Sequence, residues 1–90
     1  MAKAILTMKV MPETADIDLG QLEIEATKAI ESLGGKVGKS EKEPIAFGLH
    51  SLILMFTADE NLGSEEFEEK VGKLEGVQSA QITDFRRALG

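Results

Sequence analysis

The sequence predicts an α+β sandwich in which two helices cover one face of a four-stranded antiparallel sheet. Three observations lead to this prediction: four stretches of strand character, two amphipathic helical stripes, and the order in which they alternate. The order is strand, helix, strand, strand, helix, strand, which is typical of the ferredoxin-like fold. Because 90 residues are close to the size of an ordinary domain, residues 1–90 are expected to form a single domain.

The first strand is predicted over residues 4–11, where apolar and β-branched residues crowd together and nothing interrupts them before Pro12. The even positions make one apolar face, and the odd positions are mixed. The even positions are Ala4, Leu6, Met8 and Val10. This alternation indicates a strand with one face on the core.

The first helix is predicted to begin after Asp18, a good N-cap residue, with Gln21 three positions later as the partner in a capping box. Gly34 and Gly35 are expected to end it through a left-handed residue. Between them, apolar residues recur every three or four positions, as on one face of a helix. These residues are Leu19, Leu22, Ala26, Ala29, Ile30 and Leu33.

The middle of the chain contains a weak and a strong strand signal. Residues 36–43 carry lysines around a single strongly apolar residue, Val37, which fits either a charged edge strand or a loop. Residues 43–48 predict a turn or loop because Pro44 and Gly48 punctuate them. Residues 49–58 are the most hydrophobic segment and apolar on both faces, which predicts a central strand.

A second helix is predicted to begin with Ser64 as its cap and to end at Gly76, with Glu65 and Glu66 in the first turn. Its buried stripe is expected to be Phe67, Val71 and Leu74.

The last strand is predicted over residues 77–87, with strict alternation of odd and even positions. The first and third strands are the most apolar, and are therefore expected at the centre of the sheet. The helix-free face is expected to be lined by Thr7, Lys9, Ser51, Ile53 and Met55.

Composition excludes several classes of function. The net charge of −6 and pI of about 4.7 argue against nucleic-acid binding and against an anionic membrane surface. The chain has no cysteine, which excludes disulfides, thiolate zinc sites and cysteine nucleophiles. His50 is the single histidine and is expected to be a surface residue without a catalytic role. The longest apolar run is far shorter than the ~20 residues that span a bilayer, and the N-terminus does not resemble a signal peptide, so a cytoplasmic protein is expected. No catalytic constellation is visible, and a protein without enzymatic activity, metal or cofactor is expected. We also expect it to be a monomer when free.

Two features stand above this background. Residues 44–48 form an apolar loop in an acidic protein, and its Phe47 either packs into the protein's own core or is an exposed anchor for a partner. Arg86 and Arg87 are the only adjacent arginines. They form either a solubilising tail or a cationic probe for an anionic site on another molecule.

Several short segments carry a family resemblance. They are KVMPE at residues 9–13, DIDL at 16–19, EPIAFGL at 43–49, EGVQS at 75–79 and TDFRR at 83–87. In this order and spacing they resemble the archaeal translation elongation factor 1-beta family, and the similarity covers nearly the whole chain.

The resemblance implies a guanine-nucleotide exchange factor that promotes GDP-to-GTP exchange on the elongation factor 1-alpha GTPase. It implies that the loop of Pro44, Ile45, Phe47 and Gly48 binds this partner, with Phe47 docking on it. It also implies that a cation near the C-terminus enters the magnesium and phosphate region of the nucleotide site. The similar exchange domain of the eukaryotic factor has a lysine at the place that matches Arg87, and Arg86 is the adjacent candidate.

A small-ligand-binding regulatory module is the alternative, because many domains with this order of elements bind amino acids and a fold does not fix a function. Such a domain is expected to be fused to an enzyme or to dimerise through a sheet edge. Protection against thermal unfolding by amino acids would support this alternative.

Overall fold

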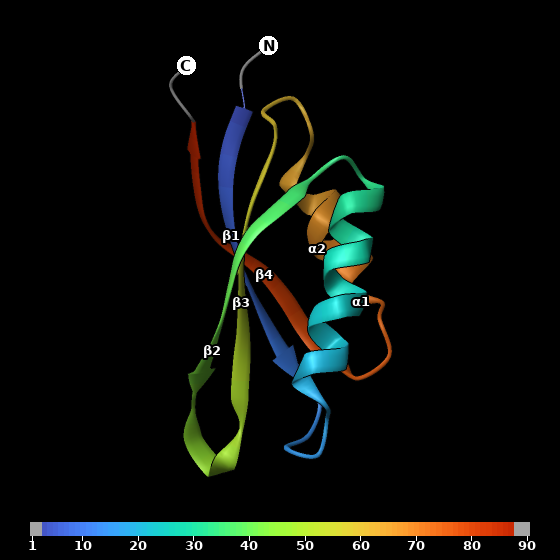
Figure 1. Ribbon diagram of the computed structural model, residues 1–90, viewed down its shortest axis with the longest axis vertical. Coiled ribbons are helices and arrows are strands. Elements are labelled where there is room, and N and C mark those ends of the chain that lie inside the picture. The colour runs from blue at the N-terminus through green and yellow to red at the C-terminus, as the bar shows by residue number, and fades with distance from the viewer. Residues whose placement is uncertain (1–2, 88–90) are drawn as a thin grey trace.

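A computed structural model of the protein describes residues 3–87 (Figure 1). Its elements are β1 (Lys3–Pro12), α1 (Leu19–Ser32), β2 (Lys36–Pro44), the 3₁₀ turn η1 (Ala46–Gly48), β3 (His50–Asp59), α2 (Ser64–Gly72) and β4 (Val77–Arg87). The four strands form one sheet in the order β2-β3-β1-β4, and all neighbours are antiparallel. The predicted ferredoxin-like α+β fold is confirmed, with β1 and β3 at its centre.

The core lies between the sheet and the two helices, which cover the same face (Figure 1). The even residues of β1 are all essentially inaccessible to solvent, as their alternation predicted. Phe56 of β3 and Phe67 of α2 meet there, with ring centroids 4.9 Å apart. Such a pair adds favourable quadrupole contact to the burial of two large rings.

Helix α1 begins as predicted. Asp18 Oδ1 accepts hydrogen bonds from the backbone N–H groups of Gly20 and Gln21 at 2.9 and 3.2 Å. The Gln21 side chain donates to Glu25 instead of reaching back to Asp18, so only one half of the capping box forms. Gly34 has φ 96°, the left-handed conformation that ends the helix.

The predicted bounds of α2 are wrong at both ends. Its N-cap is Gly63 and Ser64 is already helical, without a capping hydrogen bond from a side chain. The helix ends at Gly72, and Gly76, with φ 88°, belongs to the turn before β4. Glycine is a poor helix former, which explains the early end. Leu74 therefore packs against the core from the turn rather than from the helix.

Of the two alternatives for residues 36–43, the edge strand is confirmed and the loop is wrong, because these residues lie in β2 at the edge of the sheet. Its pairing with β3 shifts between Val37 and Lys39, so that Gly38 forms a bulge. A bulge and a row of charged side chains both discourage further strand pairing at an edge.

The strict alternation predicted for β4 is wrong, because the strand shifts register twice against β1. The shifts fall between Thr7 and Met8 and between Met11 and Pro12 on β1. Each extra residue on β4 reverses which side chains face the helices. The β4 residues opposite core-facing positions of β1 are Val77, Ala80, Ile82, Phe85 and Arg87.

Candidate functional site

The loop over residues 44–48 forms the tip of the β2–β3 hairpin at one end of the molecule (Figure 1). Ile45 N–H donates to Leu49 O at 2.8 Å, and Leu49 N–H donates to Ala46 O at 3.3 Å. Pro44 pairs opposite His50 at the last rung of the ladder, and Ile45 is half-buried below the tip. These contacts make a short, closed loop on a rigid hairpin.

Phe47 is 96% exposed at the apex of this loop, so the possibility that it packs into the protein's own core is wrong. Its φ of 63° and ψ of 31° make it the one non-glycine residue with positive φ in the described range 3–87. Gly48 follows with φ 76°. A left-handed backbone costs a bulky residue about 1–2 kcal/mol. Neither a strained backbone nor an aromatic ring in water stabilises the fold, so folding does not account for a phenylalanine at this position.

Arg86 and Arg87 end β4 and lie on opposite faces of the sheet. Arg86 pairs opposite Ile5 on the helix-free face, where its Nε lies 2.8 Å from Asp84 Oδ2. Arg87 pairs opposite the buried Ala4, on the helix side, where its Nε lies 3.1 Å from Glu60 Oε2. Both guanidinium groups are largely exposed, but they are directed to different sides of the molecule.

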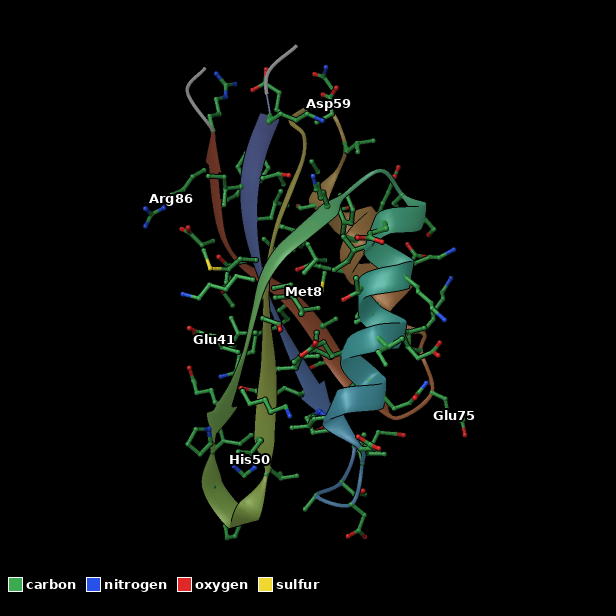
Figure 2. All side chains as sticks on the ribbon, in the orientation of Figure 1. Met8, Glu41, His50, Asp59, Glu75 and Arg86 are labelled. Atoms are coloured by element: carbon green, nitrogen blue, oxygen red, sulfur yellow. The ribbon has the colours of Figure 1, made fainter. Side chains whose placement is uncertain are left out.

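The tip of the β2–β3 hairpin and the end of β4, which carries the two arginines, lie at opposite ends of the molecule (Figures 1 and 2). Strand β3 begins at His50, next to the loop. Near the other end of β3, Ala58 lies level with Arg87, because both residues pair with Ala4 of β1. At about 3.3 Å per residue these ends are about 25 Å apart. The longest dimension of the protein is 42 Å. The structure does not bring the two candidate features into one pocket, so a partner that contacts both must extend along the molecule.

Two acidic residues that contact β4 have partners that sequence reasoning missed. Glu60, in the loop before α2, is the partner of Arg87, and Glu68 Oε2 of α2 accepts a hydrogen bond from Ile82 N–H of β4 at 2.7 Å. In the sequence both belong to an acidic stretch that indicates a solvated surface. Their partners are far along the chain, so local spacing carries no signal for either contact.

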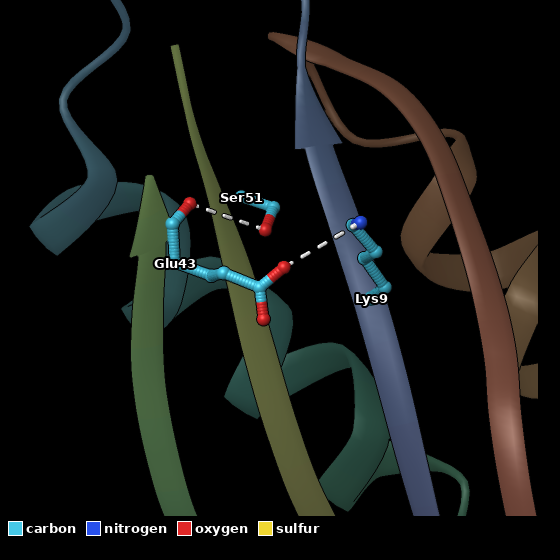
Figure 3. Close-up of polar contacts among 3 residues, drawn as sticks. All are labelled: Lys9, Glu43 and Ser51. Carbon is cyan, nitrogen blue, oxygen red and sulfur yellow. Dashed lines mark hydrogen bonds and ion pairs between the residues drawn. The ribbon is translucent and has the colours of Figure 1, made fainter. Parts of the chain in front are cut away.

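The helix-free face carries the predicted residues, with one correction. Ser51 is fully buried, because it lies between Glu43 and Lys9, as Figure 3 shows. Lys9 Nζ lies 3.8 Å from Glu43 Oε1, and Ser51 Oγ donates to Glu43 O at 3.4 Å. Further along this face is an open hollow of about 260 Å³. It is lined by Ile5, Lys36, Gly38, Lys39, Met55, Phe56 and Thr57.

Within residues 3–87 no three or more histidine, cysteine or acidic side chains are grouped so that they could hold a metal ion. No helix in that range is long and apolar enough to cross a membrane.

Residues 5–88 match a family model described as the EF-1 guanine nucleotide exchange domain. The elongation factor 1-beta of Methanothermobacter thermautotrophicus is 39% identical over 90 residues, which cover 99% of this chain and 100% of the relative. That of Methanobrevibacter smithii is 41% identical over the same shares of both chains. That of Sulfolobus acidocaldarius is 38% identical over 85 residues, 92% of this chain and 93% of the relative.

Fold and matched domain together define a guanine nucleotide exchange domain of the translation elongation factors. The chain belongs to the archaeal elongation factor 1-beta family. Its role is therefore nucleotide exchange in translation elongation, and the alternative of a small-ligand regulatory module has no support among these relatives.

Proposed function

We propose that this protein accelerates the release of GDP from elongation factor 1-alpha by binding it at two separate points. Phe47 at the hairpin tip supplies binding energy, and Arg87 at the other end perturbs the phosphate and magnesium region of the partner's nucleotide site. The observation that carries this proposal is the strained, 96% exposed Phe47, which has no evident use in folding.

Phe47 suits a docking role because its ring loses water only when a partner covers it. Burying an exposed phenylalanine contributes about 1.5–3 kcal/mol. The ring stands on a short loop between two paired strands, so little conformational entropy is lost on binding. Pro44, Ile45 and Gly48 serve this role indirectly, since they fix the shape of the loop.

Arg87 suits a role at an anionic site because a guanidinium is always charged and binds phosphate or carboxylate oxygens in a forked geometry. The magnesium ion of a nucleotide site is the largest local charge holding the phosphates. A cation that competes with this ion, or that draws away the side chains around it, weakens nucleotide binding. Arg86 is directed to the opposite face of the sheet. A partner bound in one orientation can therefore receive only one of the two arginines in its nucleotide site.

Exchange of this kind needs no covalent step. A protein that binds the empty GTPase more tightly than the loaded one must weaken nucleotide binding by the same factor. A coupling of about 1.4 kcal/mol corresponds to tenfold. The net charge of −6 favours approach to a partner with a basic surface.

The test is the release of a fluorescent GDP from purified archaeal elongation factor 1-alpha, with and without this protein. We expect Phe47→Ala to lower the second-order rate of stimulated release about 10- to 100-fold, the equivalent of the lost burial. Arg87→Ala is expected to lower it about tenfold or more, and more than Arg86→Ala does. Lys28→Ala, which removes an exposed cation from α1, is the matched control.

Circular dichroism and thermal unfolding of each variant separate loss of function from loss of fold. Full activity of a folded Phe47→Ala variant would overturn the docking role. Equal activity of Arg87→Ala and Lys28→Ala would overturn the role of Arg87.

A further inference from the structure

The contact between Arg87 and Glu60 joins the end of β4 to the loop that precedes α2. Arg87 Nε lies 3.1 Å from Glu60 Oε2, and the Arg87 side chain is 77% exposed whereas that of Glu60 is only 26% exposed. The bulge on β4 produces this contact, because it turns Arg87 to the helix side of the sheet. Without that extra residue, Arg87 would lie on the helix-free face, away from Glu60.

Glu60 is held in place by its own loop. Asp59 Oδ1 accepts the Asn61 N–H at 2.9 Å, and Asp59 O accepts the Leu62 N–H at 3.0 Å. Leu62 packs against the hydrophobic core. Glu60 is therefore presented by a closed turn anchored in the core, and the mobile partner of the pair is the long Arg87 side chain.

The Arg87 guanidinium also compensates a buried oxygen of Glu60. Its Oε2 atom is buried, and within the described residues it has no hydrogen-bond donor, since the Arg87 contact is close but does not have hydrogen-bond geometry. Burying a carboxylate oxygen without a donor is costly unless a cation compensates it. The nearby guanidinium supplies that compensation. Because the Glu60 side chain keeps 26% exposure to solvent, movement of Arg87 toward another anion removes only part of the stabilisation of the carboxylate.

We propose that Glu60 is a positioning residue that restrains Arg87 in the free protein and competes for it with the anionic site of the partner GTPase. The inference rests on the proposed role of Arg87. The restraint keeps the cation on the helix side at the end of β4, and engagement of the partner requires the ion pair to break. An ion pair of this exposure contributes little, so the restraint slows exchange modestly and does not block it.

The test is a double-mutant cycle in the GDP-release assay with the full chain and purified archaeal elongation factor 1-alpha. Glu60→Gln is expected to raise the second-order rate of stimulated release about two- to fivefold, the range for one weak ion pair. In the Arg87→Ala background the same substitution is expected to change nothing. Glu66→Gln is the matched control, because it removes an exposed acid from the same end of α2.

A second readout does not depend on the partner. In ¹⁵N NMR spectra of the free protein, the Arg87 Nε–H signal is expected to shift and to exchange faster with water in Glu60→Gln, and to stay unchanged in Glu66→Gln. An unchanged Arg87 signal in Glu60→Gln would overturn the restraint itself.

The exchange assay separates the two proposals. If Arg87→Ala lowers release but Glu60→Gln behaves as Glu66→Gln does, the competition is wrong and the role of Arg87 stands. If Glu60→Gln still raises the rate of GDP release in the Arg87→Ala background, the effect comes from the change in net charge of the protein. That result would overturn the proposal that Glu60 competes with the partner for Arg87. If Arg87→Ala has no effect on release, the role of Arg87 fails, and the competition fails with it.

Discussion

Glu68 on α2 accepts the backbone N–H of Ile82 on β4 at 2.7 Å, beside the bulge that sets the faces of Phe85, Arg86 and Arg87. The carboxylate satisfies a strand N–H that the irregular pairing with β1 leaves available. Helix α2 thereby stabilises the register of the strand that carries the arginines.

Glu68→Ala is expected to lower the free energy of unfolding by about 1–3 kcal/mol, because a partly buried N–H loses a charged acceptor. Urea unfolding measures this loss. Glu69→Ala, on the exposed neighbouring position, is the control and should cost less than about 0.5 kcal/mol. Amide hydrogen exchange should be faster at Ile82 in Glu68→Ala, and unchanged protection there would contradict the assigned contact.

Phe47→Gly is expected to leave the free energy of unfolding unchanged or to raise it by up to about 1 kcal/mol, because glycine adopts positive φ without strain. Phe67→Ala, which removes a core ring, should cost about 3–5 kcal/mol in the same urea titration. A loss of more than 1 kcal/mol in Phe47→Gly would show that the ring supports the fold.

Gly35→Ala is expected to destabilise the protein by about 1–3 kcal/mol, because a Cβ atom there would lie 2.6 Å from Ile30 Cγ2 and 3.2 Å from Phe56 Cδ2. Gly38→Ala is the matched control, since a Cβ at that bulge position meets no atom within 4 Å. Thermal unfolding of both variants compares them directly. Equal melting temperatures would contradict the close approach of the turn between α1 and β2 to the core at Gly35.

The double variant Phe47→Ala/Arg87→Ala is expected to lose exchange activity by the product of the two single losses. Sites more than about 10 Å apart with no shared partners act independently, to within about 0.5 kcal/mol. Measurement of the GDP-release rate for the wild type, both single variants and the double variant completes the cycle. If the GDP-release rate of the double variant is no lower than that of the less active single variant, the two residues act at one point.

The predictions that succeeded depend on strong local periodicity. The even face of β1 is buried throughout. The predicted stripe of α1 is buried in its middle and half-buried at its two ends, Leu19 and Leu33. Helix α2 is short and acidic, and the glycine inside its predicted span, Gly72, ends it before Gly76. Local pattern therefore predicts an element more securely than its bounds.

The features that the sequence did not predict depend on tertiary contacts. Composition alone favours burial of an isolated aromatic such as Phe47, yet the closed loop and left-handed backbone expose it. The bulges of β4 arise from its pairing with β1, and no residue in β4 marks them. For the same reason the sequence indicates two adjacent arginines but not that Arg86 and Arg87 face opposite sides.

The length of the β2–β3 hairpin sets how far the aromatic tip lies from the basic end of the molecule. Because side chains alternate with a period of two, adding two residues to each strand of the β2–β3 hairpin would preserve every face. It would also carry the aromatic tip outward by about 7 Å while the basic end stayed fixed. Under the proposed two-point binding, the length of this hairpin must match the distance between the two contact surfaces on the partner, whatever residues make those contacts.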